Sequence, residues 1–165
     1  MEKTVENQDI PAVVHAAVEK HGGSREAIIP ILSEINSALG YIPAEAFQEV
    51  KRQVQTPEDQ VFVSESQLFS MASFYHMLST KPMGRHVVQF CESAPCHVVG
   101  GRKILLALQD ALQIKAGETS QDKKWSLVTT SCLGLCDMGP VILIDEDLYS
   151  NLKADQIPGI LARYE

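Results

Sequence analysis

The chain has 165 residues, of which 45% are hydrophobic and 21% charged, and its formal net charge is −7. This composition is typical of a globular protein that folds as one domain with an extension or as two small domains, and the negative charge argues against nucleic-acid binding. There is no uncharged apolar run of about 18 residues to predict a membrane span, and the first residues lack the pattern of a signal peptide.

Helical patterns fill the first half of the chain. Apolar residues at spacings of three and four predict a helix over residues 28–39, with Ser24 as its N-cap. Pro30 should kink this helix or mark its beginning, and Gly40 supplies a C-terminal stop.

Two further helices are predicted before residue 80. One begins near Tyr41, with Pro43 in its first turn. The next opens with a capping box formed by Ser64 and Gln67. Its apolar positions, which we expect to face a core, are Leu68, Met71, Phe74 and Tyr75.

The second half of the chain alternates between strand and helix patterns. Strands are predicted at 86–90, 125–130 and 141–144, and helices at 100–114 and 154–165. This alternation predicts an α/β domain in the size range of thioredoxin. We therefore expect two domains, a helical region at residues 1–80 and an α/β domain at residues 81–165.

The four cysteines form two short motifs, each next to a predicted strand. Cys91 and Cys96 follow the strand at 86–90, while Cys132 and Cys136 precede the strand at 141–144. We expect a cytosolic protein, or one on the cytosolic face of a membrane-bound complex. In that reducing compartment a disulfide framework is not expected, which leaves metal binding, thiol catalysis or burial.

The cysteine spacing favours a two-iron cluster over other thiol sites. The chain has no Cys-x-x-Cys redox pair, and its Cys-x4-Cys motif lies at the edge of the zinc-knuckle range. Plant-type ferredoxins share that opening motif but continue with Cys-x2-Cys. Two loops with two thiolates each suit a [2Fe–2S] cluster, one loop to each iron. A Rieske centre would need two histidines, so we expect His97 beside the cluster and not bound to it.

The loop residues also suit a cluster. Gly134 and Gly139 should let backbone N–H groups approach the sulfurs and should permit positive φ angles. Asp137, and the acidic run at 145–147 if it lies close, would add negative charge and favour a low reduction potential. A solvated hairpin turn is the alternative interpretation of that run.

Four segments together resemble a known family. They are "LGYIPAEAF", "SMASFYHML", "CESAPCHVVGGRKILLAL" and "CLGLCDMGPVILIDEDLY". The chain resembles, over about residues 20–165, the small iron–sulfur (E-type) subunit of NADH:quinone oxidoreductase, or bacterial complex I. Relatives of that subunit occur in NAD-linked hydrogenases and formate dehydrogenases.

The resemblance implies a thioredoxin-like [2Fe–2S] ferredoxin domain preceded by an N-terminal helical bundle. It implies one [2Fe–2S] cluster bound by Cys91, Cys96, Cys132 and Cys136. It also implies a partner flavoprotein subunit that carries FMN and binds NADH, together with further iron–sulfur subunits. The sequence agrees, because its glycine pairs, such as Gly100-Gly101, are isolated and form no nucleotide-binding motif.

The expected function is therefore electron transfer within an NADH-oxidising oxidoreductase complex. A hydrogenase or formate dehydrogenase host would use the same mechanism. Two alternatives of another class remain, a stand-alone thioredoxin-like ferredoxin and a structural zinc module.

Overall fold

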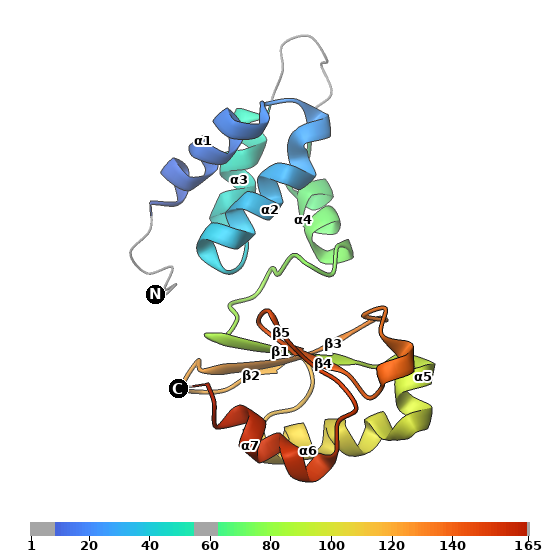
Figure 1. The fold of residues 1–165 in the computed structure, drawn as a ribbon. Coiled ribbons are helices and arrows are strands. Elements are labelled where there is room, and N and C mark those ends of the chain that lie inside the picture. The colour runs from blue at the N-terminus through green and yellow to red at the C-terminus, as the bar shows by residue number, and fades with distance from the viewer. Residues whose placement is uncertain (1–8, 55–62, 165) are drawn as a thin grey trace. The chain divides into compact units, whose positions relative to one another are not determined.

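The computed structural model describes residues 9–54 and 63–164, and the chain divides into two compact units. The first unit comprises residues 1–82 and the second residues 83–165 (Figure 1). Each unit has a hydrophobic core of its own. Within the described residues, no helix combines the length and the hydrophobicity required to cross a bilayer.

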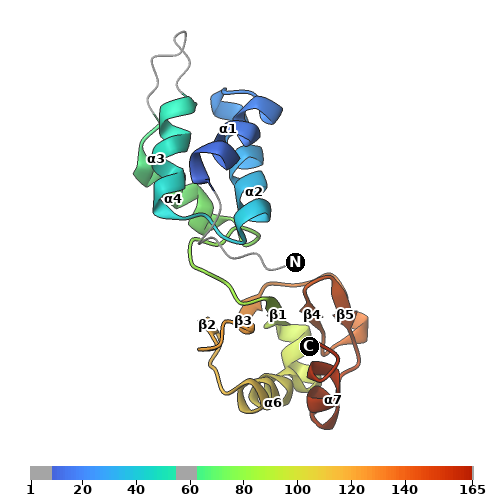
Figure 2. The ribbon, with the colours of Figure 1, turned by 90° about the vertical axis from the view of Figure 1, so that its left-hand side faces the viewer.

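The first unit consists of helices that bury one shared core (Figure 2). They are α1 (Ile10–His21), α2 (Ile28–Leu39), α3 (Ala44–Gln53) and α4 (Glu65–Phe74). The apolar face of α2 is its main contribution to the core, through Ile28, Ile31, Leu32, Ile35 and Leu39. Each such buried side chain contributes about 1.5–3 kcal/mol of hydrophobic free energy. The predicted helical periodicity over residues 28–39 is thus confirmed.

The C-terminal end of α2 lies where it was predicted, whereas the beginnings of α2 and α3 differ in detail from expectation. Gly40 is left-handed, with a φ of 82°, and its N–H donates to the Asn36 carbonyl at 2.8 Å, which confirms the predicted stop. Pro30 lies in the first turn of α2, where it marks the beginning of the helix. Ser24 precedes a short 3-10 turn, and so it is not the N-cap of α2. Pro43 takes the N-cap position of α3, one residue before the helix.

The capping box at α4 is confirmed, but its expected apolar face is only partly buried. The Ser64 hydroxyl accepts the Gln67 N–H at 3.2 Å, and the Ser64 N–H donates to the Gln67 side chain at 3.0 Å. Leu68 is buried, whereas Phe74 is 81% exposed and Tyr75 is 37% exposed. The prediction was wrong for these two rings because the helix ends at Phe74.

The second unit is a five-stranded sheet in the order β2-β3-β1-β4-β5. Its strands are β1 (His86–Cys91), β2 (Glu118–Thr119), β3 (Trp125–Thr130), β4 (Ile142–Ile144) and β5 (Asp147–Tyr149). Strands β1 and β3 are parallel, and the other neighbours are antiparallel. The helices are α5 (Ala94–Cys96), α6 (Arg102–Leu112) and α7 (Ile157–Leu161), and α6 and α7 lie on one face of the sheet (Figures 1 and 2).

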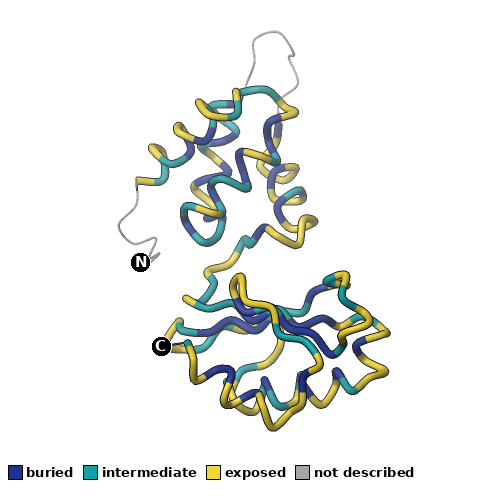
Figure 3. The backbone as a smooth tube through the Cα atoms, in the orientation of Figure 1, coloured by how far each residue is buried: buried dark blue, intermediate teal, exposed yellow. Residues whose placement is uncertain are grey.

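The sheet positions confirm the predicted α/β fold class. A parallel pair requires a crossover, which α6 supplies between β1 and β3. The predicted strands appear as β1, β3 and β4, while the two short edge strands β2 and β5 were not predicted. The buried stretches of the tube run along the central strands (Figure 3).

An aromatic cluster fastens the last described residues to the sheet. The Tyr164 ring packs against His86 and Trp125, with ring centroids 5.3 and 5.8 Å apart. Its hydroxyl donates to Asp147 at 2.7 Å and lies 2.8 Å from the Tyr149 hydroxyl. We call the group formed by His86, Trp125, Asp147, Tyr149 and Tyr164 the aromatic latch. It lies at the beginning of β1 and β3, since His86 and Trp125 are the first residues of those strands.

Candidate metal centre

The four cysteines leave the sheet at the same edge. Cys91 is the last residue of β1 and lies beside Thr130, the last residue of the parallel strand β3. Cys96 closes the short helix α5, five residues after Cys91. Cys132 lies in the loop after β3, and Cys136 opens the 3-10 turn Cys136–Met138. The parallel pairing therefore brings two distant segments of sequence together.

The thiols form a buried pair and an exposed pair. Cys91 and Cys96 are 1% and 2% exposed, and they cluster with the buried side chain of Val141. Cys132 and Cys136 are exposed, with their Sγ atoms 3.2 Å apart. The apolar residues between the exposed thiols, Leu133 and Leu135, pack against the buried cluster.

The electrostatics link the two pairs. Burial raises the pKa of Cys91, but hydrogen bonds from the Ser93 and Leu133 backbone and other local hydrogen bonds bring this pKa below its usual value. Burial, and then interaction with Cys91, raises the pKa of Cys96. The hydrogen bond with Cys132 is the main cause of the raised pKa of Cys136, to which Asp137 also contributes. Several thiolates this close repel one another, so the arrangement favours a bound cation.

The glycines of the second loop have two different roles. Gly134 has a φ of 84°, and its N–H donates to Cys132 Sγ at 3.3 Å, so both expectations for it are confirmed. Gly139 does not use the positive φ that glycine permits, because its φ is −65°. Its backbone passes close to the buried cysteine: a Cβ there would lie 3.4 Å from Cys96 Sγ and 3.0 Å from Val99 Cγ2.

The Gly100-Gly101 pair supports the buried cysteines, a role that the sequence pattern did not predict. A Cβ on Gly101 would lie 2.7 Å from the Cys96 carbonyl oxygen, closer than a side chain can approach. Gly100 has a φ of 107° and turns the chain into α6. The signal in the sequence was the position of the pair, directly after Cys96 and ahead of a helix.

The acidic run lies away from the thiols, which corrects its expected effect on them. Asp145 is in the two-residue loop between β4 and β5, and it accepts hydrogen bonds from His86 and from the Val87 N–H at 2.7 and 2.9 Å. These contacts place it at the beginning of β1, whereas Cys91 ends that strand about 16 Å away. The hairpin interpretation is the correct one, and it is Asp137, next to Cys136, that helps to raise the pKa of a thiol.

The donor set fits a two-iron cluster. In residues 9–54 and 63–164, no group of three or more Cys, His, Asp or Glu side chains is arranged as a metal-ion site. The thiols come as two pairs, and a [2Fe–2S] cluster takes two protein thiolates on each iron. His97 is exposed beside Cys96.

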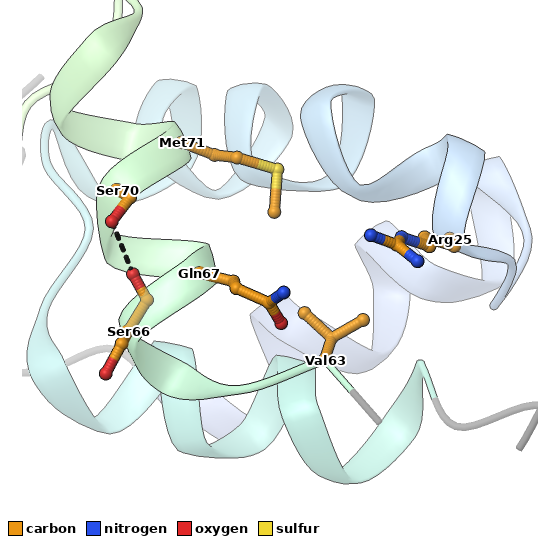
Figure 4. A pocket seen from close by; sticks show the side chains of 6 residues that line it. All are labelled: Arg25, Val63, Ser66, Gln67, Ser70 and Met71. Atoms are coloured by element: carbon orange, nitrogen blue, oxygen red, sulfur yellow. Dashed lines mark hydrogen bonds between the residues drawn. The ribbon is translucent and has the colours of Figure 1, made fainter. Parts of the chain in front are cut away.

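A separate pocket of about 380 Å³ lies in the helical unit (Figure 4). Its lining comprises Arg25, Val63, Ser66, Gln67, Ser70 and Met71. The Ser70 hydroxyl donates to the Ser66 carbonyl at 2.7 Å, and Gln67 is engaged in the capping box, so these polar groups serve the helix itself. The pocket contains none of the predicted ligands.

Known proteins resemble this chain in sequence and in fold. Residues 14–165 match the family model described as thioredoxin-like [2Fe-2S] ferredoxin. The E-type subunit of NADH-quinone oxidoreductase from Salmonella typhimurium is 36% identical over 149 residues, covering 89% of this chain and 86% of that protein. The corresponding Escherichia coli protein is also 36% identical, over 141 residues that cover 86% of this chain and 81% of that protein.

One solved structure, that of an NAD+-reducing [NiFe]-hydrogenase in the air-oxidized state, shares the fold. Its chain superposes with a TM-score of 0.55 at 19% sequence identity. The match covers 99% of this chain but 24% of the hydrogenase chain, so this chain spans about a quarter of that protein's length.

Proposed function

The chain belongs to the thioredoxin-like [2Fe–2S] ferredoxin family, and from this premise we propose that it is the electron-transfer subunit of an NADH-oxidising complex. We propose that Cys91, Cys96, Cys132 and Cys136 hold one [2Fe–2S] cluster. The observation that carries this proposal is the meeting of two thiol pairs at one edge of the sheet.

The chain's own residues provide ligands and environment. When bound, a [2Fe–2S] cluster accepts and returns one electron. Cys91 and Cys96 supply buried thiolates beneath Val141, where water is excluded. Cys132 and Cys136 would supply thiolates at the surface, on the side of the site that a partner protein can approach. The Gly134 N–H, which donates to Cys132, stabilises negative charge on that sulfur.

We further propose a partner subunit that carries FMN and binds NADH, with additional iron–sulfur subunits beyond it. The relatives described above are named as subunits of NADH-quinone oxidoreductase, an oxidoreductase complex. The sequence has no nucleotide-binding glycine motif, so the electron must come from another polypeptide. An NAD-linked hydrogenase or formate dehydrogenase could serve as host by the same mechanism. In each case we place the chain in the cytoplasm or on the cytoplasmic face of a membrane-bound complex.

The test is metal and sulfide analysis of the full chain purified without oxygen. The proposal requires about two irons and about two acid-labile sulfides per chain. Reduction with dithionite should then give an S = 1/2 signal in electron paramagnetic resonance. Zinc without sulfide would contradict the proposal and establish the structural zinc module.

The partner is tested separately, by purifying the chain from cells that also express the neighbouring genes. A subunit should co-purify with a protein that contains FMN. A cluster-loaded chain that elutes alone, as a monomer or homodimer, would instead indicate a stand-alone ferredoxin.

A further inference from the structure

The exposed thiols differ from the buried pair in access to solvent. Cys132 and Cys136 are exposed and their sulfurs are 3.2 Å apart, whereas Cys91 and Cys96 are at most 2% exposed. We propose that Cys132 and Cys136 form a redox modification site. When they bind no metal, a peroxide joins them in a disulfide within the loop and leaves the buried pair reduced.

The backbone of the loop allows this closure. Three residues separate the two cysteines, and Gly134 at the middle of the loop already has a φ of 84°. Cys132 lies in irregular structure, where no helix or strand hydrogen bonds hold its position. The sulfurs need to move closer by little more than 1 Å to reach the bonded distance of about 2.0 Å.

The selectivity follows from packing. Thiol oxidation follows thiolate character and exposure, and a peroxide must contact a sulfur atom to oxidise it. Exposure is the factor that separates the two pairs here, because the peroxide reaches only Cys132 and Cys136. Cys91 and Cys96 lie under Val141, with Leu133 and Leu135 packed against them. The loop that carries the exposed thiols therefore also covers the buried ones.

The reaction is balanced with hydrogen peroxide as the oxidant. One thiol of the pair, as its thiolate, attacks a peroxide oxygen, so that the O–O bond breaks and a sulfenic acid and one water form. The second thiol attacks the sulfenic sulfur, the S–O bond breaks and a second water leaves. Two thiols lose two electrons and two protons, which the peroxide takes up.

This disulfide would remove two of the four donors and block iron loading until a thiol reductant reopens it. The inference goes beyond the proposed function, because it concerns the chain without bound metal. It holds for any metal that the four cysteines bind. Iron and sulfide are measured before the metal is removed, so failure of the cluster proposal and failure of this one are distinguishable.

The experiment uses the full chain, stripped of metal by a chelator, reduced, desalted without oxygen and treated with equimolar hydrogen peroxide. Free thiols are alkylated in guanidinium with an isotopically light alkylating reagent. Disulfides are then reduced, and the thiols released from them are alkylated with the isotopically heavy form of the same reagent. Mass spectrometry should find heavy label on Cys132 and Cys136 and light label on Cys91 and Cys96. Dithiothreitol should restore all four thiols and the ability to bind iron.

Two variants form a matched control. Cys96→Ser, which removes a buried thiol, should leave the disulfide in place. Cys136→Ser should abolish it, and a dimedone adduct should then appear on Cys132.

Heavy label on Cys91 and Cys96 would overturn the proposal. So would four free thiols at a peroxide concentration that oxidises glutathione in the same buffer. Circular dichroism checks that the stripped chain stays folded, and mixed pairings among all four cysteines would contradict the selectivity.

Discussion

Two glycines, Gly134 and Gly159, differ in backbone conformation but not in the space around them. A Cβ would meet nothing within 4 Å at either position, but Gly134 has a φ of 84° whereas Gly159 lies in α7. We expect Gly134→Ala to destabilise the metal-free, reduced chain by about 1–2 kcal/mol, because L-residues avoid positive φ. Gly159→Ala should instead stabilise it, by up to about 1 kcal/mol. Urea unfolding followed by Trp125 fluorescence measures both, and equal effects would refute the conformational argument.

A second prediction at this scale concerns the ligands. Cys91→Ala and Cys132→Ala should each abolish or severely reduce iron binding, because each removes one thiolate of a pair. His97→Ala should retain iron, since this exposed side chain is not among the proposed ligands. Iron per chain and visible absorption report the result. Loss of iron from the histidine variant, with retention in a cysteine variant, would show that the ligand assignment is wrong.

The sequence pointed to the four cysteines, through their spacing and the family resemblance, and their role as ligands remains a prediction. A role for glycine at positions 134 and 139 was expected, but the local conformations were harder to predict. The two positions differ, since Gly134 has a positive φ whereas Gly139 lies in a tight space. The tightness at Gly139 comes from a tertiary contact, because a Cβ there would lie 3.0 Å from Val99 Cγ2, and no local pattern encodes that contact.

At the scale of elements, we expect the aromatic latch to make the free energy of unfolding decline as the pH rises in the alkaline range. Burial, then hydrogen bonds with Tyr149 and Asp147, raises the pKa of Tyr164. The contribution of the Tyr164 hydroxyl to the free energy of unfolding is fully present below the ordinary tyrosine pKa of about 10. It is lost progressively above that pH, because Tyr164 then ionises in the unfolded chain but not in the folded chain. Tyr164→Phe should therefore lower stability at neutral pH but flatten the decline between about pH 9 and 11.

Urea midpoints across this pH range, in the metal-free reduced chain, measure the effect. Because the compared chains all contain the same four cysteines, the effect of cysteine ionisation on the urea midpoint cancels in the comparison. Tyr41→Phe, in the helical unit, should leave the Trp125 transition unchanged. An equally steep alkaline decline in Tyr164→Phe would count against the latch as its cause.

Elements with a clear sequence pattern were predictable, including the three-residue strand β4, whereas the two short edge strands were not. Strands β1 and β3 each extend over six positions and bury apolar side chains, Val88 and Phe90 in β1 and Trp125 and Leu127 in β3, which gave a signal. The edge strands β2 and β5 have two and three residues, and they form because the neighbouring strands β3 and β4 offer hydrogen-bonding groups. The exposure of Phe74 also escaped prediction, because it depends on where α4 ends, and the apolar pattern did not indicate that end.

At the scale of the whole molecule, the two separate cores predict two separable unfolding transitions. Trp125 is the only tryptophan and lies in the second unit, whereas the first unit is helical. Ile35→Ala should lower the stability of the helical unit by about 2–5 kcal/mol, and Leu127→Ala should lower that of the sheet unit by a similar amount. Each side chain is fully buried in its own core.

Helical circular dichroism and tryptophan fluorescence follow the two transitions in urea. Ile35→Ala should shift chiefly the dichroism curve, and Leu127→Ala the fluorescence curve. Coincident shifts of both curves in both variants would mean that the units unfold as one. The expected domain boundary between residues 80 and 81 remains a prediction that such variants begin to examine.

The central strand β1 has Cys91 at one end and the aromatic latch, through His86, at the other. The proposed ligands and the latch therefore lie at opposite ends of the sheet unit, about 16 Å apart along β1. If the cluster-loaded protein is adsorbed on an electrode through the thiol-bearing end, the oxidation and reduction peaks in voltammetry should lie close together. If it is tethered through the latch end, the electron has a longer path, and the two peaks should separate at much lower scan rates.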